Sequence, residues 1–284
     1  MSWSRVKTVL IVFFLFVDAF LIYNTFVRNR PGTDISAQTV SNTVKVLANA
    51  GITVNPDIIK QKTPTLKKPE ISNSVDGRQK LAENLMGNDI KKTENGFESD
   101  KGRIVFNAVA FSYENFDSDV SLKGIEEKNA IDIAASYLSK HGFDVKSSAV
   151  RDFNAGDNGY YIKFGKEIDG YPLYESYLDI YIEKSGRLTR IEGYWPEIYE
   201  QSVNSGKVSC IDRTKVLINL LSVPELNLDE KNEVADIQTG YTLGGLPDSD
   251  SPILLTLLPA YRVILKNGEN YIFDATNGEF LYKS

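Results

Sequence analysis

Residues 260–282 read AYRVILKNGENYIFDATNGEFLY, and this stretch decides the fold. Two Asn-Gly pairs, Asn267-Gly268 and Asn277-Gly278, interrupt three runs that are rich in aromatic and β-branched residues. Asn-Gly favours the tight turn of a β-hairpin because glycine takes a positive φ without steric cost. The stretch therefore predicts three antiparallel strands joined by two short turns.

The order of elements around this stretch occurs twice, at an offset of 92 residues. With Gly186 set against Gly278, the matches are Ile180 with Ile272, Tyr181 with Phe273 and Leu188 with Phe280. A helical pattern precedes each set of strands, SLKGIEEKNAIDIAASYLSKHGF at 121–143 and CIDRTKVLINLLS at 210–222. We predict two repeats, 121–196 and 209–284, each with a helix across one face of a curved antiparallel sheet. The alternative is that glycine hairpins occur in any β-rich chain and that no true repeat exists.

The residues before the repeats predict a further unit. Val40, Val44 and Leu47 recur at helical spacing, and Gly51 follows the pattern. The residues that follow, up to 118, have strand-like runs with glycine turns, including Asn95-Gly96. We expect 35–118 to form an N-terminal α+β domain, with RNRPGTD at 28–34 as a polar linker.

Residues 9–27, VLIVFFLFVDAFLIYNTFV, have the length and composition of a membrane helix. A spanning helix needs roughly 20 mostly apolar residues. A cleaved signal peptide is the alternative, but its apolar region usually spans about 7–15 residues. Basic residues flank both ends equally, so the orientation rests on the short stub, 1–8, which we expect to stay in the cytoplasm. The sequence predicts a single-pass protein of the cell membrane with an extracellular C-terminal region.

Asp18 lies at the centre of this apolar run. A carboxylate there costs roughly 2.5–3.5 kcal/mol on insertion scales. Ile11, Asp18 and Thr25 are seven residues apart and share one helix face. We predict that this face meets another membrane helix through hydrogen bonds from Asp18. The alternative is a protonated Asp18 that lies among lipid without a partner.

The amino-acid composition excludes several kinds of partner and site. Residues 31–284 carry 28 basic and 37 acidic residues, a net charge of −9, which argues against nucleic acid as a partner. The chain has one cysteine, Cys210, and one histidine, His141, so an internal disulfide and a Cys/His zinc cluster are both excluded. His141 precedes a glycine at a helix end, where a basic ring meets the last carbonyls. We interpret Cys210 as a small buried residue.

No nucleotide-binding loop, metalloprotease motif or calcium loop stands in the sequence. We therefore expect no catalytic residues, no cofactor and no metal. A hydrolase that uses two carboxylates stays open, because 38 acidic residues are scattered along the chain.

Two motifs resemble known families. Asp274, Ala275, Gly278 and Glu279 stand where a PepSY-type domain has its "D-A-x-T/N-G-E" turn before a closing strand. The start, with Trp3-Ser4, basic residues and one membrane helix, resembles the YycI (WalI) family. The resemblance covers the whole architecture, although Ser2 replaces the acidic residue that members often carry.

The resemblance implies an extracytoplasmic α+β region built from PepSY-like, YycH-like units behind one membrane helix. It implies a regulator of the WalK/WalR (YycG/YycF) two-component system of low-GC Gram-positive bacteria, which controls cell-wall functions. The partners would be a YycH-like protein and the sensor histidine kinase, and the family has no catalytic residues to carry over. The alternative function is an extracytoplasmic inhibitor or enzyme that acts on cell-wall or peptidase targets.

Overall fold

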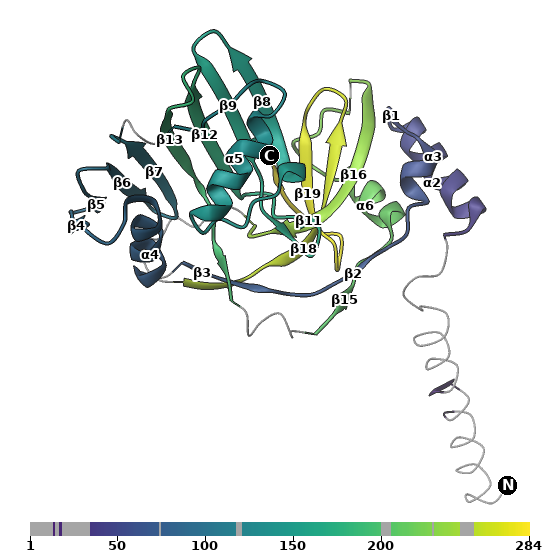
Figure 1. The fold of residues 1–284 in the computed structure, drawn as a ribbon. Helices are drawn as coiled ribbons and strands as arrows, with labels where there is room; N and C mark the ends of the chain where they lie inside the picture. Colours follow the sequence, from purple (N-terminus) through teal and green to yellow (C-terminus); the bar gives the residue numbers. More distant parts are fainter. Residues whose placement is uncertain are drawn as a thin grey trace, which may run out of the picture.

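The computed structural model describes residues 14, 17–18, 35–73, 75–117, 121–199, 206–228, 230–244 and 253–284, with the backbone alone at 72, 73, 75, 76, 253 and 254. The fold is mixed α+β with mostly antiparallel sheets and few helices (Figure 1), as the sequence predicts. The stub 1–8 and the linker 28–34 lie outside the described residues. Within 9–27 only Phe14, Val17 and Asp18 are described, and all three are helical.

The membrane prediction is not tested by the described part of the chain. No helix among the described residues is both long and apolar enough to span a membrane.

One half of the described protein is built on a five-stranded sheet, which we call the small sheet. Its strand order is β1-β16-β18-β19-β20. The strands are β1 (Ile52–Val54), β16 (Asn232–Thr242), β18 (Leu258–Leu265), β19 (Asn270–Asp274) and β20 (Phe280–Lys283). Helices α2 (Ala37–Asn49), α3 (Pro56–Ile59) and α6 (Arg213–Leu220) share its core, in which Leu47, Leu217 and Tyr261 are fully buried. Asp212 begins α6, because its carboxylate accepts a hydrogen bond from the Lys215 backbone nitrogen.

The other half is built on an eight-stranded sheet, which we call the large sheet. Its strand order is β4-β5-β6-β7-β13-β12-β9-β8. The strands are β4 (Lys91–Lys92), β5 (Gly96–Glu98), β6 (Gly102–Asn107), β7 (Ala110–Asn115), β8 (Val150–Gly156), β9 (Gly159–Phe164), β12 (Tyr177–Glu183) and β13 (Leu188–Tyr194). Helices α4 (Val75–Met86) and α5 (Ala130–Lys140) pack on one face, with a 3-10 turn at Ser147–Ala149 before β8. Along β12 every second residue is buried, including Leu178, Ile180 and Ile182.

The two predicted repeats have the same order of elements. In 121–196, α5 precedes β8, β9, β12 and β13, and in 209–284, α6 precedes β16, β18, β19 and β20. In both segments each of these four strands pairs antiparallel with the next of the four. Gly186 and Gly278 both turn the last hairpin with positive φ, +86° and +85°. Each segment is therefore a helix followed by a four-stranded meander.

The offset of 92 residues holds only after the last turn. Ile182 pairs with Leu188 in the first meander, and Phe273 pairs with Phe280 in the second. The strand before the turn is thus offset by 91, and the predicted match of Ile180 with Ile272 is wrong by one residue. The reason is that the turn at Gly278 contains one residue more than the turn at Gly186, as its closing hydrogen bonds show.

Residues 35–118, expected to form one domain, contribute to both halves. Strand β1 pairs parallel with β16, and α2 contacts α6, so 37–59 belong to the small sheet. Strands β4 to β7 extend the large sheet beyond β13, because β7 pairs antiparallel with β13. One edge strand of each meander thus pairs with a strand from this region.

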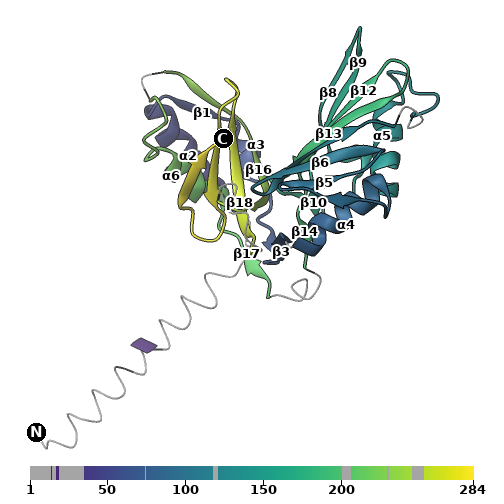
Figure 2. The ribbon, with the colours of Figure 1, turned by 90° about the vertical axis from the view of Figure 1, so that its left-hand side faces the viewer.

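Short strands join the two halves at their base. Strand β3 (Glu70–Asn73) lies between β14 (Glu197–Ile198) and β17 (Ile253–Thr256), and β2 (Thr65–Leu66) pairs with β15 (Val208–Ser209). A small hairpin of β10 (Glu167–Ile168) and β11 (Tyr171–Pro172) lies in the β9–β12 connection. In Figure 2, α2 and α6 lie outside one sheet and α5 lies outside the other, so the helix-free faces turn toward each other.

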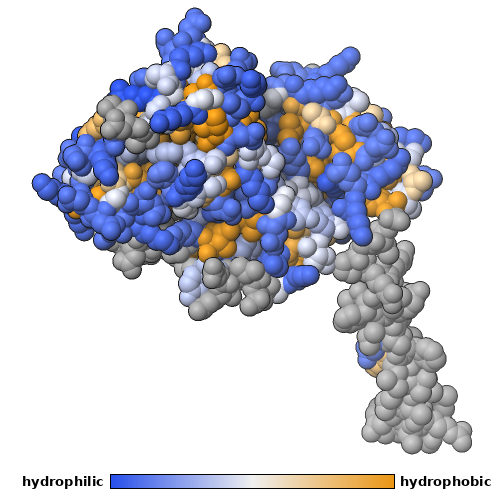
Figure 3. All heavy atoms as spheres, viewed as in Figure 1, coloured by the Kyte–Doolittle hydropathy of each residue, from blue (hydrophilic) through white to orange (hydrophobic). Residues whose placement is uncertain are grey.

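Polar and apolar contacts cross between the helix-free faces. Tyr174 packs on Ala260 and Ile272 of the small sheet. Beside it, Glu175 accepts a 2.5 Å hydrogen bond from the Tyr282 hydroxyl, and further bonds from the Thr242 hydroxyl and the Leu243 backbone nitrogen. The connection before β12 is therefore anchored to the small sheet. In the space-filling view the surface is hollowed between the two halves (Figure 3).

Candidate functional site

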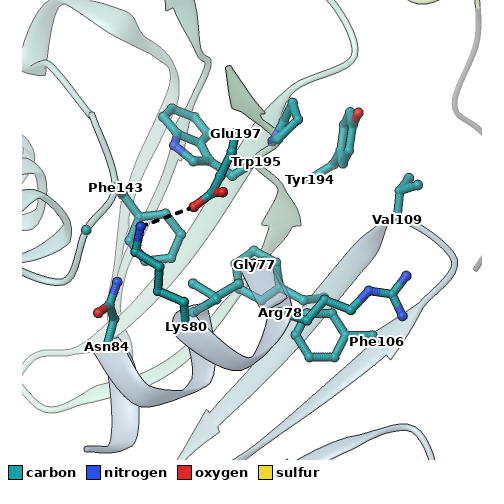
Figure 4. Close-up of a pocket in the computed structure, with 14 residues that line it drawn as sticks. Gly77, Arg78, Lys80, Asn84, Phe106, Val109, Phe143, Tyr194, Trp195 and Glu197 are labelled. Atoms are coloured by element: carbon teal, nitrogen blue, oxygen red, sulfur yellow. Dashed lines mark ion pairs between the residues drawn. The ribbon is translucent and has the colours of Figure 1, made fainter. Parts of the chain in front are cut away.

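A cavity of about 190 Å³ lies where α4 meets the large sheet (Figure 4). Four separate segments line it: helix α4, the β6–β7 hairpin, the loop after α5 and the chain between β13 and β14. The lining residues are Gly77, Arg78, Lys80, Leu81, Asn84, Phe106, Val109, Phe111, Gly142, Phe143, Tyr194, Trp195, Pro196 and Glu197. We call this cavity the aromatic pocket.

A row of four aromatic rings forms the floor of the aromatic pocket. The ring centroids of Phe106 and Phe111 are 6.5 Å apart, those of Phe111 and Phe143 are 6.1 Å apart, and those of Phe143 and Trp195 are 6.4 Å apart. Gly142 ends α5 with φ +86°, and the Phe143 nitrogen then donates back to the Leu138 carbonyl. This helix end turns the Phe143 side chain inward. Its ring therefore lies between Phe111 of the β6–β7 hairpin and Trp195 of the chain that follows β13.

Charged side chains form the rim. Arg78 donates to the Ala108 carbonyl at 2.7 Å and lies over the Phe106 ring at 5.2 Å, which fixes it across the hairpin. Lys80 and Glu197 form an ion pair at 3.7 Å across the opening (Figure 4). Both side chains are mostly exposed, so the pair costs little to open.

Trp195 carries an unpaired donor at this site. Its indole nitrogen is buried and has no hydrogen-bond acceptor among the described residues. The Lys166 ammonium lies 4.9 Å from the Trp195 ring centroid. Burial lowers the pKa of Lys166 to about 8, while the nearby carboxylates of Asp144 and Glu197 oppose the shift.

This arrangement suits binding of one large apolar group. The volume of the aromatic pocket is below the roughly 300–1,000 Å³ of typical small-molecule pockets. An aromatic floor with a charged rim matches the pockets that receive anchor residues at protein interfaces. Among the described residues, no group of three or more His, Cys, Asp and Glu side chains is placed to hold a metal ion.

The predicted membrane-face residues are only partly placed by the structure. Asp18 is helical and exposed, whereas Ile11 and Thr25 lie outside the described residues. The predicted common face of these three residues thus stays a prediction.

The two singled-out reactive residues have the structural roles that the sequence predicts. The His141 Nδ1 atom lies 2.8 Å from the Tyr137 carbonyl oxygen, at the end of α5. Cys210 is buried before α6, and burial raises the pKa of its thiol to about 11. Neither residue lines the aromatic pocket.

Sequence reasoning did not find the aromatic pocket. Its aromatic residues come from segments that are far apart in the sequence, and each residue alone is typical of a strand or a helix end. The one local signal is Gly142-Phe143, a helix-ending glycine followed by a large apolar residue. No protein-family model matches the chain, and no curated protein matches it.

Proposed function

We propose that this protein is a membrane-anchored regulatory binding protein that modulates a sensor histidine kinase of the WalK (YycG) type. It acts together with a YycH-like partner, through its membrane helix and its extracellular halves. The proposal places residues 9–27 across the cell membrane with the N-terminus in the cytoplasm. It assigns no reaction, cofactor or metal to the chain.

The repeated helix and meander carry this proposal. Two segments of this topology are what the resemblance to PepSY-like units leads us to expect, and the second ends in the turn on which that resemblance rests. In that turn Asp274 accepts hydrogen bonds from the backbone and hydroxyl of Thr276, and Gly278 donates to the Asp274 carbonyl. The aromatic pocket supports the proposal, since it provides a recess for an anchor residue of a partner.

The first experiment is co-purification from membranes in detergent. The full-length chain, the kinase and the YycH-like protein are co-expressed, and recovery of the kinase is measured for the wild type, Asp18→Leu, Asp18→Asn and a polyleucine exchange of 9–27. We expect Asp18→Leu and the polyleucine helix to reduce recovery severalfold. Asp18→Asn should retain most of it, because an amide still forms hydrogen bonds in the bilayer.

The second arm tests the aromatic pocket. Lys80→Glu reverses a charge on its rim, and Lys60→Glu makes the same change at an exposed ion pair of the small-sheet half. We expect only Lys80→Glu to lower recovery of the partners. Normal recovery with Lys80→Glu would remove the pocket from the contact, and failure of the wild type to recover either partner would refute the proposed function.

A further inference from the structure

A second cavity, of about 400 Å³, lies between the two halves. One wall comes from the large-sheet half, through β8 and the β10–β11 hairpin, and the other comes from β16, β18 and β19 of the small sheet. Arg151 and Arg262 line it from opposite halves. The feature that calls for an explanation is the set of partners around Arg262.

Arg262 is oriented but largely unpaired. Its guanidinium lies 4.3 Å from the Tyr174 ring centroid, and its Nη2 atom donates to the Gln238 side-chain oxygen at 2.9 Å. Its Nε atom is buried and has no acceptor among the described residues. A guanidinium has five N–H donors, so stacking and one amide leave most of its hydrogen-bonding capacity unused.

Arg190 in the large sheet provides a comparison within the same chain. It also lies 4.3 Å from a tyrosine ring, that of Tyr181. Its Nε atom, however, is 3.5 Å from the Glu192 carboxylate. Arg262 has the same stacking, but among the described residues the amide of Gln238 stands in place of a carboxylate.

Arg151 adds a second positive charge. Its guanidinium donates to the carbonyls of Leu173, Tyr174 and Ser176. Gly165 makes room for it, because a Cβ there would lie 2.0 Å from the Arg151 Nε atom. Burial lowers the pKa of Arg151 to about 10, and the positive charge of Arg262 adds to this shift.

Two carboxylates lie near the arginines, but neither accepts a hydrogen bond from the unpaired donors of Arg262. Glu167 lines the cavity and Glu175 lies behind Tyr174, and both favour the charged form of Arg151. The Glu175 Oε1 atom accepts hydrogen bonds from Thr242, Leu243 and Tyr282, whereas its Oε2 atom is buried and has no hydrogen-bond partner among the described residues. Neither carboxylate forms an ion pair with Arg151 or Arg262 among the described residues.

We propose that this cavity binds a small oxyanion, a carboxylate or a phosphate group, through the open edge of Arg262. The Gln238 amide nitrogen, which has no acceptor among the described residues, donates a further hydrogen bond, and Arg151 supplies charge. Planar guanidinium groups bind both kinds of oxyanion in a bidentate manner. Because the walls come from both halves, the anion holds the halves together. This inference does not depend on the proposed function.

The test measures thermal unfolding of the full-length chain in detergent against inorganic phosphate and, separately, succinate, at constant ionic strength. We expect a saturable rise in the unfolding midpoint of about 3 °C at tenfold excess over the dissociation constant. The variants are Arg262→Gln, which removes the guanidinium group, and Gln238→Glu, which places a carboxylate beside Arg262 without changing the side-chain volume. Arg190→Gln is the matched control.

The rise should persist in Arg190→Gln and vanish in Gln238→Glu, a variant that gains an ion pair and so stays folded. Arg262→Gln should lose it as well. The anion that gives the larger rise identifies the source, phosphate or carboxylate. A response to neither anion, or a response that Gln238→Glu retains, would overturn the proposal.

Discussion

Lys166 shows how one residue couples the fold to pH. Its side chain is only 6% exposed, and its ammonium has an aromatic ring rather than a carboxylate as its contact. A buried ammonium without a close counter-ion is costly, which is why its pKa falls to about 8 from an ordinary 10.5. The backbone nitrogen of the same residue donates to the Ser176 hydroxyl, so the position is fixed within the β9–β12 connection.

We predict that Lys166→Met stabilises the fold at pH 7 and changes its pH dependence. Between pH 8 and 10.5 the unfolded chain keeps the Lys166 proton that the folded chain releases, so the contribution of Lys166 to wild-type stability rises with pH in this window. The variant lacks this slope, and its advantage, about 1–3 kcal/mol at pH 7, should shrink by pH 9.5. Burial raises the pKa of Cys210 and of several tyrosines, so these groups lower stability as the pH rises above about 9, but they do so equally in the wild type and in Lys166→Met.

The measurement is urea unfolding of residues 35–284 at pH 7.0, 8.5 and 9.5. Lys184→Met is the control, because the exposed Lys184 also lies over a ring, that of Tyr160, at 4.6 Å. It should leave the slope of the wild type unchanged. A Lys166→Met protein that is less stable at pH 7 would contradict the burial argument.

At the scale of elements, α2 is a component of the small-sheet core although it precedes every strand of the large sheet in the sequence. Its buried stripe contains Val40 and Leu47, and it packs against α6 and β1. Ser36 caps its first turn by accepting from the Thr39 nitrogen. The helix therefore contributes its burial energy to the half that is completed by the last strands of the chain.

We predict that Leu47→Ala costs about 2–4 kcal/mol of unfolding free energy, because Leu47 is fully buried and truncation leaves a cavity. The neighbouring Val46 is 46% exposed, so Val46→Ala should cost less than about 0.5 kcal/mol. Hydrogen exchange of 35–284 should lose protection in β16 and β18 with Leu47→Ala. Loss confined to β5 and β6 would show that α2 belongs to the other half.

Local sequence predicts the helices and strands better than it predicts which strands pair with one another. Gly278 takes the positive φ that the Asn-Gly pair predicts, and α6 lies where its helical pattern stands. Helix α5 covers only 130–140 of the pattern at 121–143, because 121–129 forms turns. The match of Ile180 with Ile272 fails because one extra turn residue moves a strand by one position, and side chains alternate faces along a strand. The division of 35–118 between two sheets depends on the parallel β1–β16 pairing, which no local pattern encodes. The aromatic pocket depends on a different long-range pairing, that of β7 with β13.

At the scale of the whole molecule, the two halves are joined by polar contacts at the base of the inter-sheet hollow. Glu175 belongs to the large-sheet half, and the Tyr282 hydroxyl that it binds belongs to β20. A hydrogen bond to a carboxylate is worth about 1.5–3 kcal/mol when its partners are shielded from water. The relative position of the halves thus rests partly on one tyrosine.

We predict that Tyr282→Phe weakens the coupling between the halves. Tyr271→Phe is the matched control, because the Tyr271 hydroxyl binds Glu269 within a single hairpin at 2.9 Å. Tyr282→Phe should lose about 1–2 kcal/mol of stability, and Tyr271→Phe should lose less, because the Glu269 carboxylate is partly exposed to water. Only Tyr282→Phe should speed hydrogen exchange in both 171–176 and 241–244. Equal exchange patterns in the two variants would show that Glu175 does not tie the halves together.

The pairing of β1 with β16 also sets an order of assembly during synthesis. Residues 75–194 contain every strand of the large sheet, so that half can close while later residues are still being made. Helix α2 and β1 emerge first but have no sheet to join until β16 follows. During this interval the apolar stripe of α2 is exposed to other chains and to quality-control proteases. We expect nascent chains that stop before β16 to contain a folded large sheet and an unprotected N-terminal segment.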